Sequence, residues 1–400
     1  MNRLWQQLGI ATNWPVLVAV GVLSSLGLMS VWAKSPTDGV RHLVFLGVAV
    51  VSMALFQAVD YRKIGRLSWG FYVLSLLLVL YTVVGAFLEP RGLQLPGVKI
   101  TKGACNWIRF GTFSLQPAEL MKVAFILVLA RYLRFRSNYR TFKGLIPPFA
   151  LAVVPLVLIL KQPDLGTALV FIPILFAMLF VAGAKVSHLL AIVLIAASLA
   201  PIAWLAGKDS KGEPFSKLPG FRYLPTMVKE YQRARVKALF TGDSDPSMRK
   251  NEGFQTYKAM TAFASGGPTG KGPGNIPVGR DVPEAHNDMI FALIGEQFGF
   301  LGSAVVLGAY IVLFAAGIEI SAATKEPFGR LVALGIVAML AGQTFINLMV
   351  AMRLMPVTGV TLPFVSYGGS SLLASYMAAG LLLNVGQNRP IVMARESFEY

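Results

Sequence analysis

The chain has 400 residues, of which 55% are hydrophobic and only 14% are charged, and this composition excludes an ordinary soluble globular protein. The net charge of +17 is spread through loops between apolar segments, so we expect membrane lipid and no nucleic acid as the partner of the cations. The single cysteine, Cys105, excludes an intramolecular disulfide.

Ten apolar segments are long enough to cross a bilayer as helices, which takes about 20 residues because hydrocarbon offers the backbone no hydrogen bonds. We therefore predict an all-α integral membrane protein of about ten helices, folded as a single domain over residues 1–400. The fourth segment is the least clean, because it carries Glu119, Lys122 and Arg131. The segments are 15–33, 43–59, 67–88, 117–133, 144–160, 165–184, 186–207, 288–320, 331–352 and 368–385.

The orientation of the predicted helices follows from their short basic loops, which face the cytoplasm. Cations without acids follow the second segment at 62–66 and end the fourth at 131–143. The first segment is too long for a cleaved signal peptide, so we expect it to be retained. Both termini are then cytoplasmic, and residues 161–164, 208–287 and 353–367 lie outside.

Three charged residues in or beside the spans are candidates for substrate contact. Glu119 and Lys122 stand three residues apart on one helical face and should pair, either at a functional site or as an internal ion pair that holds helices together. Asp164, in Gln-Pro-Asp-Leu-Gly-Thr at 162–167, is placed either to cap the next helix or to contact substrate. Both alternatives stay open for each.

The large loop at 208–287, between helices 7 and 8, contains two segments with an amphipathic pattern, 226–240 and 253–264. Its glycine-rich part at 265–277 includes Lys271 and could wrap a phosphate. The spacing of a nucleotide-binding loop is missing, so we do not expect nucleotide.

The loop ends in Pro-Glu-Ala-His-Asn-Asp at 283–288, immediately before an apolar helix. Glu284, His286 and Asp288 put two carboxylates and an imidazole at the membrane boundary, where a general base is expected. Their spacing matches no standard zinc site. The alternative for Asp288 is that it caps the following helix.

Between the last two spans, two prolines and a glycine pair at 356–371 indicate irregular backbone. Such backbone is tolerated at membrane depth where it is buried in protein or lines a cavity, so this segment, with Ser366, is a candidate cleft wall. Its small residues are equally suited to tight helix packing.

In this order, these motifs resemble the SEDS family of shape, elongation, division and sporulation proteins, over about residues 103–376. Each piece is weak alone, but the ordered set is specific. The pieces are Gly103-Ala104 with Trp107, Gln116-Pro117 with Glu119 and Lys122, the segment 162–167, Tyr231-Gln232 with Arg235, Ser265-Gly266-Gly267, Gly270-Lys271-Gly272, the segment 283–288, and Ser366-Tyr367-Gly368-Gly369.

The resemblance implies a ten-helix enzyme of the bacterial cytoplasmic membrane that polymerises lipid II into glycan strands on the outer face. It implies a class B penicillin-binding protein as partner, Asp288 as catalytic residue and Trp107 as a residue important for activity. Asn106 and Asn287 depart from the family pattern, and Arg109 is a candidate to replace the arginine usual at the first position. The subtype indicated is RodA-like, with FtsW-like second, because Pro-Val-Thr-Gly and the short tails resemble RodA while Pro-Glu-Ala-His resembles FtsW.

In the mechanism we expect, Asp288 deprotonates the 4-hydroxyl of an incoming lipid II, which attacks the anomeric carbon of the lipid-linked strand with inversion. Cations stabilise the departing pyrophosphate. The candidates are Lys271, Arg235, Lys122 and Arg109, with a divalent cation, Mg²⁺ or Mn²⁺, for which Asp288 is a possible ligand, and no organic cofactor. A lipid-precursor flippase and a non-catalytic scaffold are the alternatives.

Overall fold

A computed structural model describes residues 13–100, 105–111, 113–136, 138–208, 215, 225, 226, 228, 230–241 and 254–388. Most of the predicted large loop, the Gly103-Ala104 pair and the chain ends lie outside these residues. The long helices are α2 (Trp14–Lys34), α3 (Pro36–Ala58), α5 (Ser68–Leu88), α6 (Pro117–Arg134), α7 (Ile146–Lys161), α8 (Leu165–Ala182), α9 (Val186–Leu205), α13 (Ile290–Ala323), α14 (Pro327–Ala351) and α15 (Gly369–Gln387).

Nine of the described helices are long and apolar enough to span a membrane, and they correspond to nine of the ten predicted segments. The tenth, α6, has 18 residues but carries four charged side chains. Several bounds differ from the prediction: α3 begins at Pro36 and α14 at Pro327, because a proline at the first turn starts each helix ahead of its apolar run.

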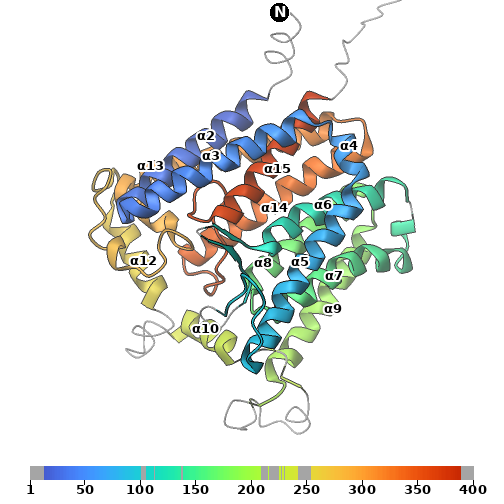
Figure 1. Cartoon of the computed structure of the whole chain (residues 1–400), viewed down its shortest axis with the longest axis horizontal. Helices are drawn as coiled ribbons and strands as arrows, with labels where there is room; N and C mark the ends of the chain where they lie inside the picture. Colours follow the sequence, from blue (N-terminus) through green and yellow to red (C-terminus); the bar gives the residue numbers. More distant parts are fainter. Residues whose placement is uncertain are drawn as a thin grey trace, which may run out of the picture.

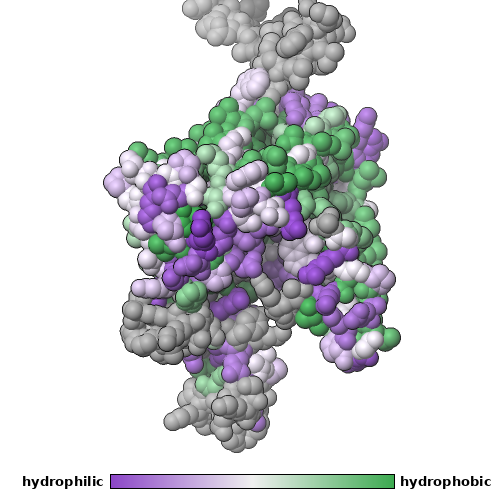
Figure 2. Space-filling view, turned by 60° about the vertical axis from the view of Figure 1, so that its left-hand side comes forward, coloured by the Kyte–Doolittle hydropathy of each residue, from purple (hydrophilic) through white to green (hydrophobic). Residues whose placement is uncertain are grey.

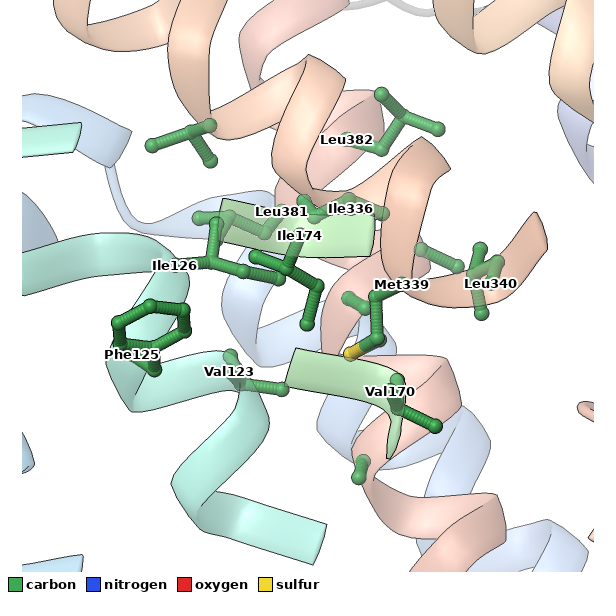
Figure 3. Close-up of a cluster of buried hydrophobic side chains, with 14 of the residues drawn as sticks. Val123, Phe125, Ile126, Val170, Ile174, Ile336, Met339, Leu340, Leu381 and Leu382 are labelled. Carbon is green, nitrogen blue, oxygen red and sulfur yellow. The ribbon is translucent and has the colours of Figure 1, made fainter. Parts of the chain in front are cut away.

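The centre of the bundle is built around α6, which packs against α5, α8, α14 and α15. Of its 18 residues, 14 are buried, so this helix lies inside protein and can carry charges that lipid would exclude. The apolar cluster of Figure 3 joins α6 to α8, α14 and α15 through buried hydrophobic side chains. Its labelled residues are Val123, Phe125, Ile126, Val170, Ile174, Ile336, Met339, Leu340, Leu381 and Leu382.

Close backbone approach joins α3 to α15, the most buried of the spans. A Cβ on Gly380 would lie 2.3 Å from the carbonyl oxygen of Met53, so only glycine fits there. In Figure 1, α15 runs beside α3, and the start of α2 and the end of α15 lie at the top. At the periphery, α9 is almost entirely uncovered by protein.

The end of the bundle opposite α4 (Tyr61–Arg66) carries the irregular segments (Figure 1). There lie α10 (Glu230–Thr241) and α12 (Phe254–Ser265), which overlap the two amphipathic segments expected at 226–240 and 253–264, and the 3₁₀ turns η1 (Glu89–Arg91) and η5 (Gly279–Asp281). The 3₁₀ turns η2 (Asn138–Arg140) and η3 (Lys143–Leu145) precede α7. The antiparallel hairpin of β1 (Ile108–Phe110) and β2 (Phe113–Leu115) is the departure from an all-helical fold among the described residues.

A kink at Gly299, with φ 64° and ψ −157°, divides α13. The amides of residues 300 and 301 donate to carbonyls of the glycine-rich loop at 267 and 268, and the carbonyls of 296 and 297 accept from its amides at 271 and 272, all at 2.9 to 3.1 Å. A Cβ on Gly270 would lie 2.1 Å from the Gln297 carbonyl oxygen. The glycines are therefore needed so that the loop can replace missing helix bonds.

The spans carry exposed hydrophobic side chains on the faces that no other helix covers, as expected for contact with lipid. Val44, Leu194 and Ile311, on three different spans, are each more than 60% exposed. In Figure 2, hydrophobic residues dominate the upper part of the face shown, and hydrophilic ones gather in its lower half. The described elements therefore form a membrane-embedded bundle with a polar end.

Candidate functional site

A cavity of about 450 Å³ opens at the polar end of the bundle. Four parts of the chain meet around it: the start of α3, the hairpin segment, the residues before α13, and the segment that leads into α15. Its lining residues are Arg41, Phe45, Trp107, Arg109, Ser114, Gln116, Asn287, Asp288, Gly359, Thr361, Tyr367, Gly368, Gly369 and Ser371. Three predicted site residues, Trp107, Arg109 and Asp288, are among them.

Hydrogen bonds to neighbouring backbone hold Asp288 at the cavity. The side-chain amide of Asn347, on α14, donates to the carbonyls of Asp288 at 2.9 Å and Val360 at 2.7 Å. The hydroxyl of Ser366 donates to the carbonyl of Asn287 at 2.6 Å. Asn347 and Ser366 are almost fully buried, so the segments at 284–288 and 357–368 are tied together as two walls.

Asp288 does not cap the following helix. The residue before α13 is Met289, and no side chain caps this end of the helix. The Asp288 amide instead donates to the Glu284 carbonyl at 3.2 Å, inside a turn where Glu284 has φ 50°. The partly exposed carboxyl group therefore faces the cavity, where Oδ2 lies 3.9 Å from a Cβ built on Gly359.

Tyr367 connects the cavity wall to the rest of the predicted motif. Its amide donates to the His286 carbonyl at 2.8 Å, and the two rings meet edge-on with centroids 5.2 Å apart. Burial raises the pKa of the Tyr367 hydroxyl, the Asp38 carboxylate adds to this shift, and a hydrogen bond with Arg41 opposes it. The phenol therefore stays neutral at physiological pH and can donate a hydrogen bond into the cavity.

The hairpin brings Trp107 and Arg109 to the cavity. Arg109 is exposed, and its backbone amide is fixed to the carbonyl of Gly97 at 2.7 Å. The hydroxyl of Ser370 donates to the Ser114 carbonyl at 2.9 Å and accepts from the Gln116 amide at 2.9 Å, which docks the hairpin onto the start of α15. A cation and an indole therefore sit on a small but anchored element.

Asp164 caps α8 and also supports the cavity wall. Its carboxylate accepts from the Thr167 amide at 3.0 Å and from the Thr167 hydroxyl at 2.9 Å, as the capping alternative predicted. It also accepts from the side chain of Gln116 at 2.7 Å, and Gln116 lines the cavity. Asp164 itself is not part of the lining, and it reaches the cavity wall through its hydrogen bond with Gln116.

Glu119 and Lys122 form the predicted pair, at 2.8 Å, and both side chains are at most 6% exposed. They lie on α6 and do not line the cavity. This geometry favours the internal ion pair over direct substrate contact.

Lys271 is engaged by a buried carboxylate. Its ammonium donates to Glu296 Oε1 at 2.6 Å and to the hydroxyl of Ser265 at 2.7 Å. Glu296 has no exposed side-chain surface and also accepts from the amides of Val278, at 3.0 Å, and Gly279, at 2.6 Å. This pair folds the glycine-rich loop onto α13, away from the cavity lining.

The remaining predicted residues are not part of the cavity lining. Glu284 accepts from the side chain of Asn287 at 2.8 Å. Arg235, on α10, donates to the carbonyl of Val357 at 2.9 Å. His286 and Ser366 act through the bonds described above.

Arg41 and Phe45 line the cavity and were missed by the sequence analysis. Arg41 lies 3.8 Å from Asp38 and is 62% exposed. The predicted second span begins at residue 43, so the prediction leaves Arg41 in the preceding loop, whereas α3 begins at Pro36. The available signal was its charge at the start of an otherwise apolar helix.

A divalent cation would find one carboxylate in the described lining, Asp288, together with two cations, Arg41 and Arg109. The described residues contain no cluster of three or more His, Cys, Asp and Glu side chains that could hold a metal alone. Mg²⁺ is commonly bound by one or two carboxylates together with substrate phosphates, and this lining fits only that mode.

Known proteins resemble this chain over nearly its whole length. The family model described as "Cell cycle protein", which covers FtsW, RodA and SpoVE, matches residues 7–390. The chain is 33% identical over 388 residues to a probable peptidoglycan glycosyltransferase FtsW of Geobacter metallireducens, covering 92% of this chain and 93% of that protein. It is 34% identical over 384 residues to stage V sporulation protein E of Bacillus subtilis, covering 93% and 94%.

Solved structures with the same fold include a chain of a peptidoglycan synthase complex, described as coordinating polymerization and crosslinking. It has a TM-score of 0.76 and 29% identity, and the match covers 95% of this chain and 99% of that one. The rod shape determining protein RodA of Thermus thermophilus has a TM-score of 0.67 and 27% identity, with 96% and 99% covered.

Proposed function

Because the chain belongs to the SEDS family and is a peptidoglycan glycosyltransferase, we propose that it polymerises lipid II into glycan strands at the Asp288 cavity. The observation that carries this proposal is the position of the carboxyl group. Asp288, held by Asn347 and the 357–368 wall, faces a cavity that also contains Trp107, Arg109 and Arg41.

Asp288 is the general base in the proposed reaction. Its carboxylate takes the proton of the incoming 4-hydroxyl as that oxygen attacks the anomeric carbon, and the bond to pyrophosphate breaks with inversion. Hydrogen bonds from Asn347 and Ser366 fix the backbone at 287 and 288, which places the Asp288 side chain at the cavity before the substrate binds.

Arg41 and Arg109 line the cavity and are placed to stabilise the negative charge that grows on the departing pyrophosphate. A guanidinium group can bind phosphate with two parallel hydrogen bonds. Lys271 and Lys122 are already paired with buried carboxylates, so we assign them structural roles. Asp288 is the lining carboxylate that would hold a divalent cation, Mg²⁺ or Mn²⁺, and such an ion would supply further charge neutralisation. The aromatic face of Trp107 offers a surface on which a sugar ring can stack.

We place the protein in the bacterial cytoplasmic membrane with both termini inside, so that the cavity faces outward. The basic residues at 62–66 and 131–143 then face the cytoplasm, at the end of the bundle away from the cavity. Substrate would enter from the outer leaflet.

A class B penicillin-binding protein is the proposed partner, since a related structure is described as a synthase complex that coordinates polymerization and crosslinking. We assign the protein to cell elongation, on the Pro-Val-Thr-Gly motif at 356–359 and the similarity to RodA structures. Relatives named FtsW and stage V sporulation protein E make division and sporulation the rival roles. Rescue of rod shape in cells depleted of their elongation polymerase supports elongation; rescue of septation alone would replace it with division.

The test is glycan-chain formation from labelled lipid II by purified protein, with and without its transpeptidase, comparing the wild type with Asp288→Asn. We expect polymer from the wild type and a loss of more than a hundredfold in the variant, as for removal of a general base. Both proteins should elute identically from a sizing column.

Two other outcomes are informative. Normal polymer from Asp288→Asn would remove Asp288 as the base and leave the enzyme assignment intact. If the wild type makes no polymer even with its partner but moves lipid II across vesicle membranes, the result would support a flippase. If it neither polymerises nor moves lipid II, the result would support a scaffold.

A further inference from the structure

An apolar groove of about 540 Å³ runs along the membrane face of α8 and α14, outside the catalytic cavity. Ile172, from α8, and Ala341 and Phe345, from α14, are among its lining residues. Ile172 is 47% exposed and Phe345 is 64% exposed, so the groove is open to the hydrocarbon. A long apolar chain could lie in it without displacing protein.

The groove ends beside two arginines. Met355, which lines its outer end, also lines a small pocket with Arg235 and Arg353. Arg353 has φ 58°, a conformation unfavourable for a residue with a side chain, where the chain turns sharply at the end of α14. An apolar groove that ends beside two guanidinium groups is complementary to an amphiphile with a phosphate head group.

The two arginines are coupled to the catalytic cavity through one short segment. Arg235 donates to the Val357 carbonyl at 2.9 Å. Two residues further on, a Cβ at Gly359 would lie 3.9 Å from Asp288 Oδ2. The segment 355–361 therefore contacts the groove at one end and the catalytic carboxylate at the other.

Joining two lipid-linked sugars requires two polyprenyl chains to reach one active site. In the acceptor, a disaccharide separates the reacting hydroxyl from its own pyrophosphate, so that pyrophosphate must bind outside the point of reaction. We propose that the α8–α14 groove binds the polyprenyl chain of the acceptor and that Arg235 and Arg353 bind its pyrophosphate. This assignment rests on the proposed function.

The direct test uses purified full-length protein in lipid nanodiscs with undecaprenyl pyrophosphate as the probe. A photoreactive residue at Phe345 should crosslink the probe, and one at Ile311, equally exposed on α13, should not. The double variant Arg235→Ala and Arg353→Ala should weaken binding at least tenfold, or about 1.4 kcal/mol, whereas Arg91→Ala should leave it unchanged. Equal crosslinking at both positions would overturn the proposal.

Two controls separate this site from the catalytic one and from ordinary lipid. Asp288→Asn should retain crosslinking at Phe345, so loss of polymerisation alone does not count against the groove. Excess phosphatidylglycerol should compete poorly; competition equal to that of unlabelled probe would reduce the groove to a general anionic lipid site. Ala341→Trp, which fills the groove, should raise KM for lipid II with little change in kcat, and an unchanged KM in the folded variant would also refute the proposal.

Discussion

The ion pair of Lys271 and Glu296 allows a test of whether Lys271 has a structural role or binds substrate. Glu296→Gln keeps the shape of the side chain but removes its negative charge. In the wild type, the Glu296 carboxylate oxygens accept hydrogen bonds from the Lys271 ammonium and from the amides of Val278 and Gly279. Breaking a buried pair by removing one partner costs about 3–5 kcal/mol. Lys271 is 25% exposed, and water compensates part of its lost partner, so we expect about 2–3 kcal/mol here.

The assay is a double-mutant cycle of Glu296→Gln and Lys271→Met, followed by thermal unfolding in detergent and by polymerisation of lipid II. Each single variant should be destabilised, and the double variant should lose about 1–3 kcal/mol less than the sum. If Lys271→Met instead lowered turnover at least tenfold with unchanged thermal stability, Lys271 would be a substrate-binding cation and the structural reading would be wrong.

Two further predictions concern the cavity and the core. Arg41→Ala should lower kcat/KM for lipid II about tenfold, or about 1.4 kcal/mol, while the matched outer cation variant Arg91→Ala stays within twofold; equal effects would show that Arg41 acts only through general charge. Gly380→Leu should abolish a monodisperse peak in fluorescence size-exclusion chromatography, because its Cβ meets Met53, whereas Gly47→Leu, with open space at its Cβ, should not; normal elution of Gly380→Leu would contradict the close approach.

The spans were predictable from sequence because hydrocarbon imposes a length and a composition that few other structures share. Among the described spans, α6 departs from that rule, because Glu119 and Lys122 are buried in protein and paired within the helix. Its other two charges, Arg131 and Arg134, lie in its last turn and bond to neighbouring elements. The hairpin was missed because strands of three residues leave no clear alternation to read.

The site was predictable only in part, because sequence shows charges and not their partners. Asp288, Trp107 and Arg109 came from motifs and do line the cavity. Lys271 was assigned to pyrophosphate because the carboxylate that engages it lies 25 positions away, on a different element. Arg41 was passed over because its position in space depends on how α3 packs against α15.

The kink at Gly299 bears on the order in which the protein is made. Residues 267–272, which satisfy the backbone groups exposed at the kink, precede α13 in the chain and leave the ribosome first. Their glycines can therefore be in place when the helix enters the bilayer, and its broken turn need never face lipid unsatisfied. A graft of α13 alone into another protein would lack that preceding loop and would be forced to straighten or to stay out of the membrane.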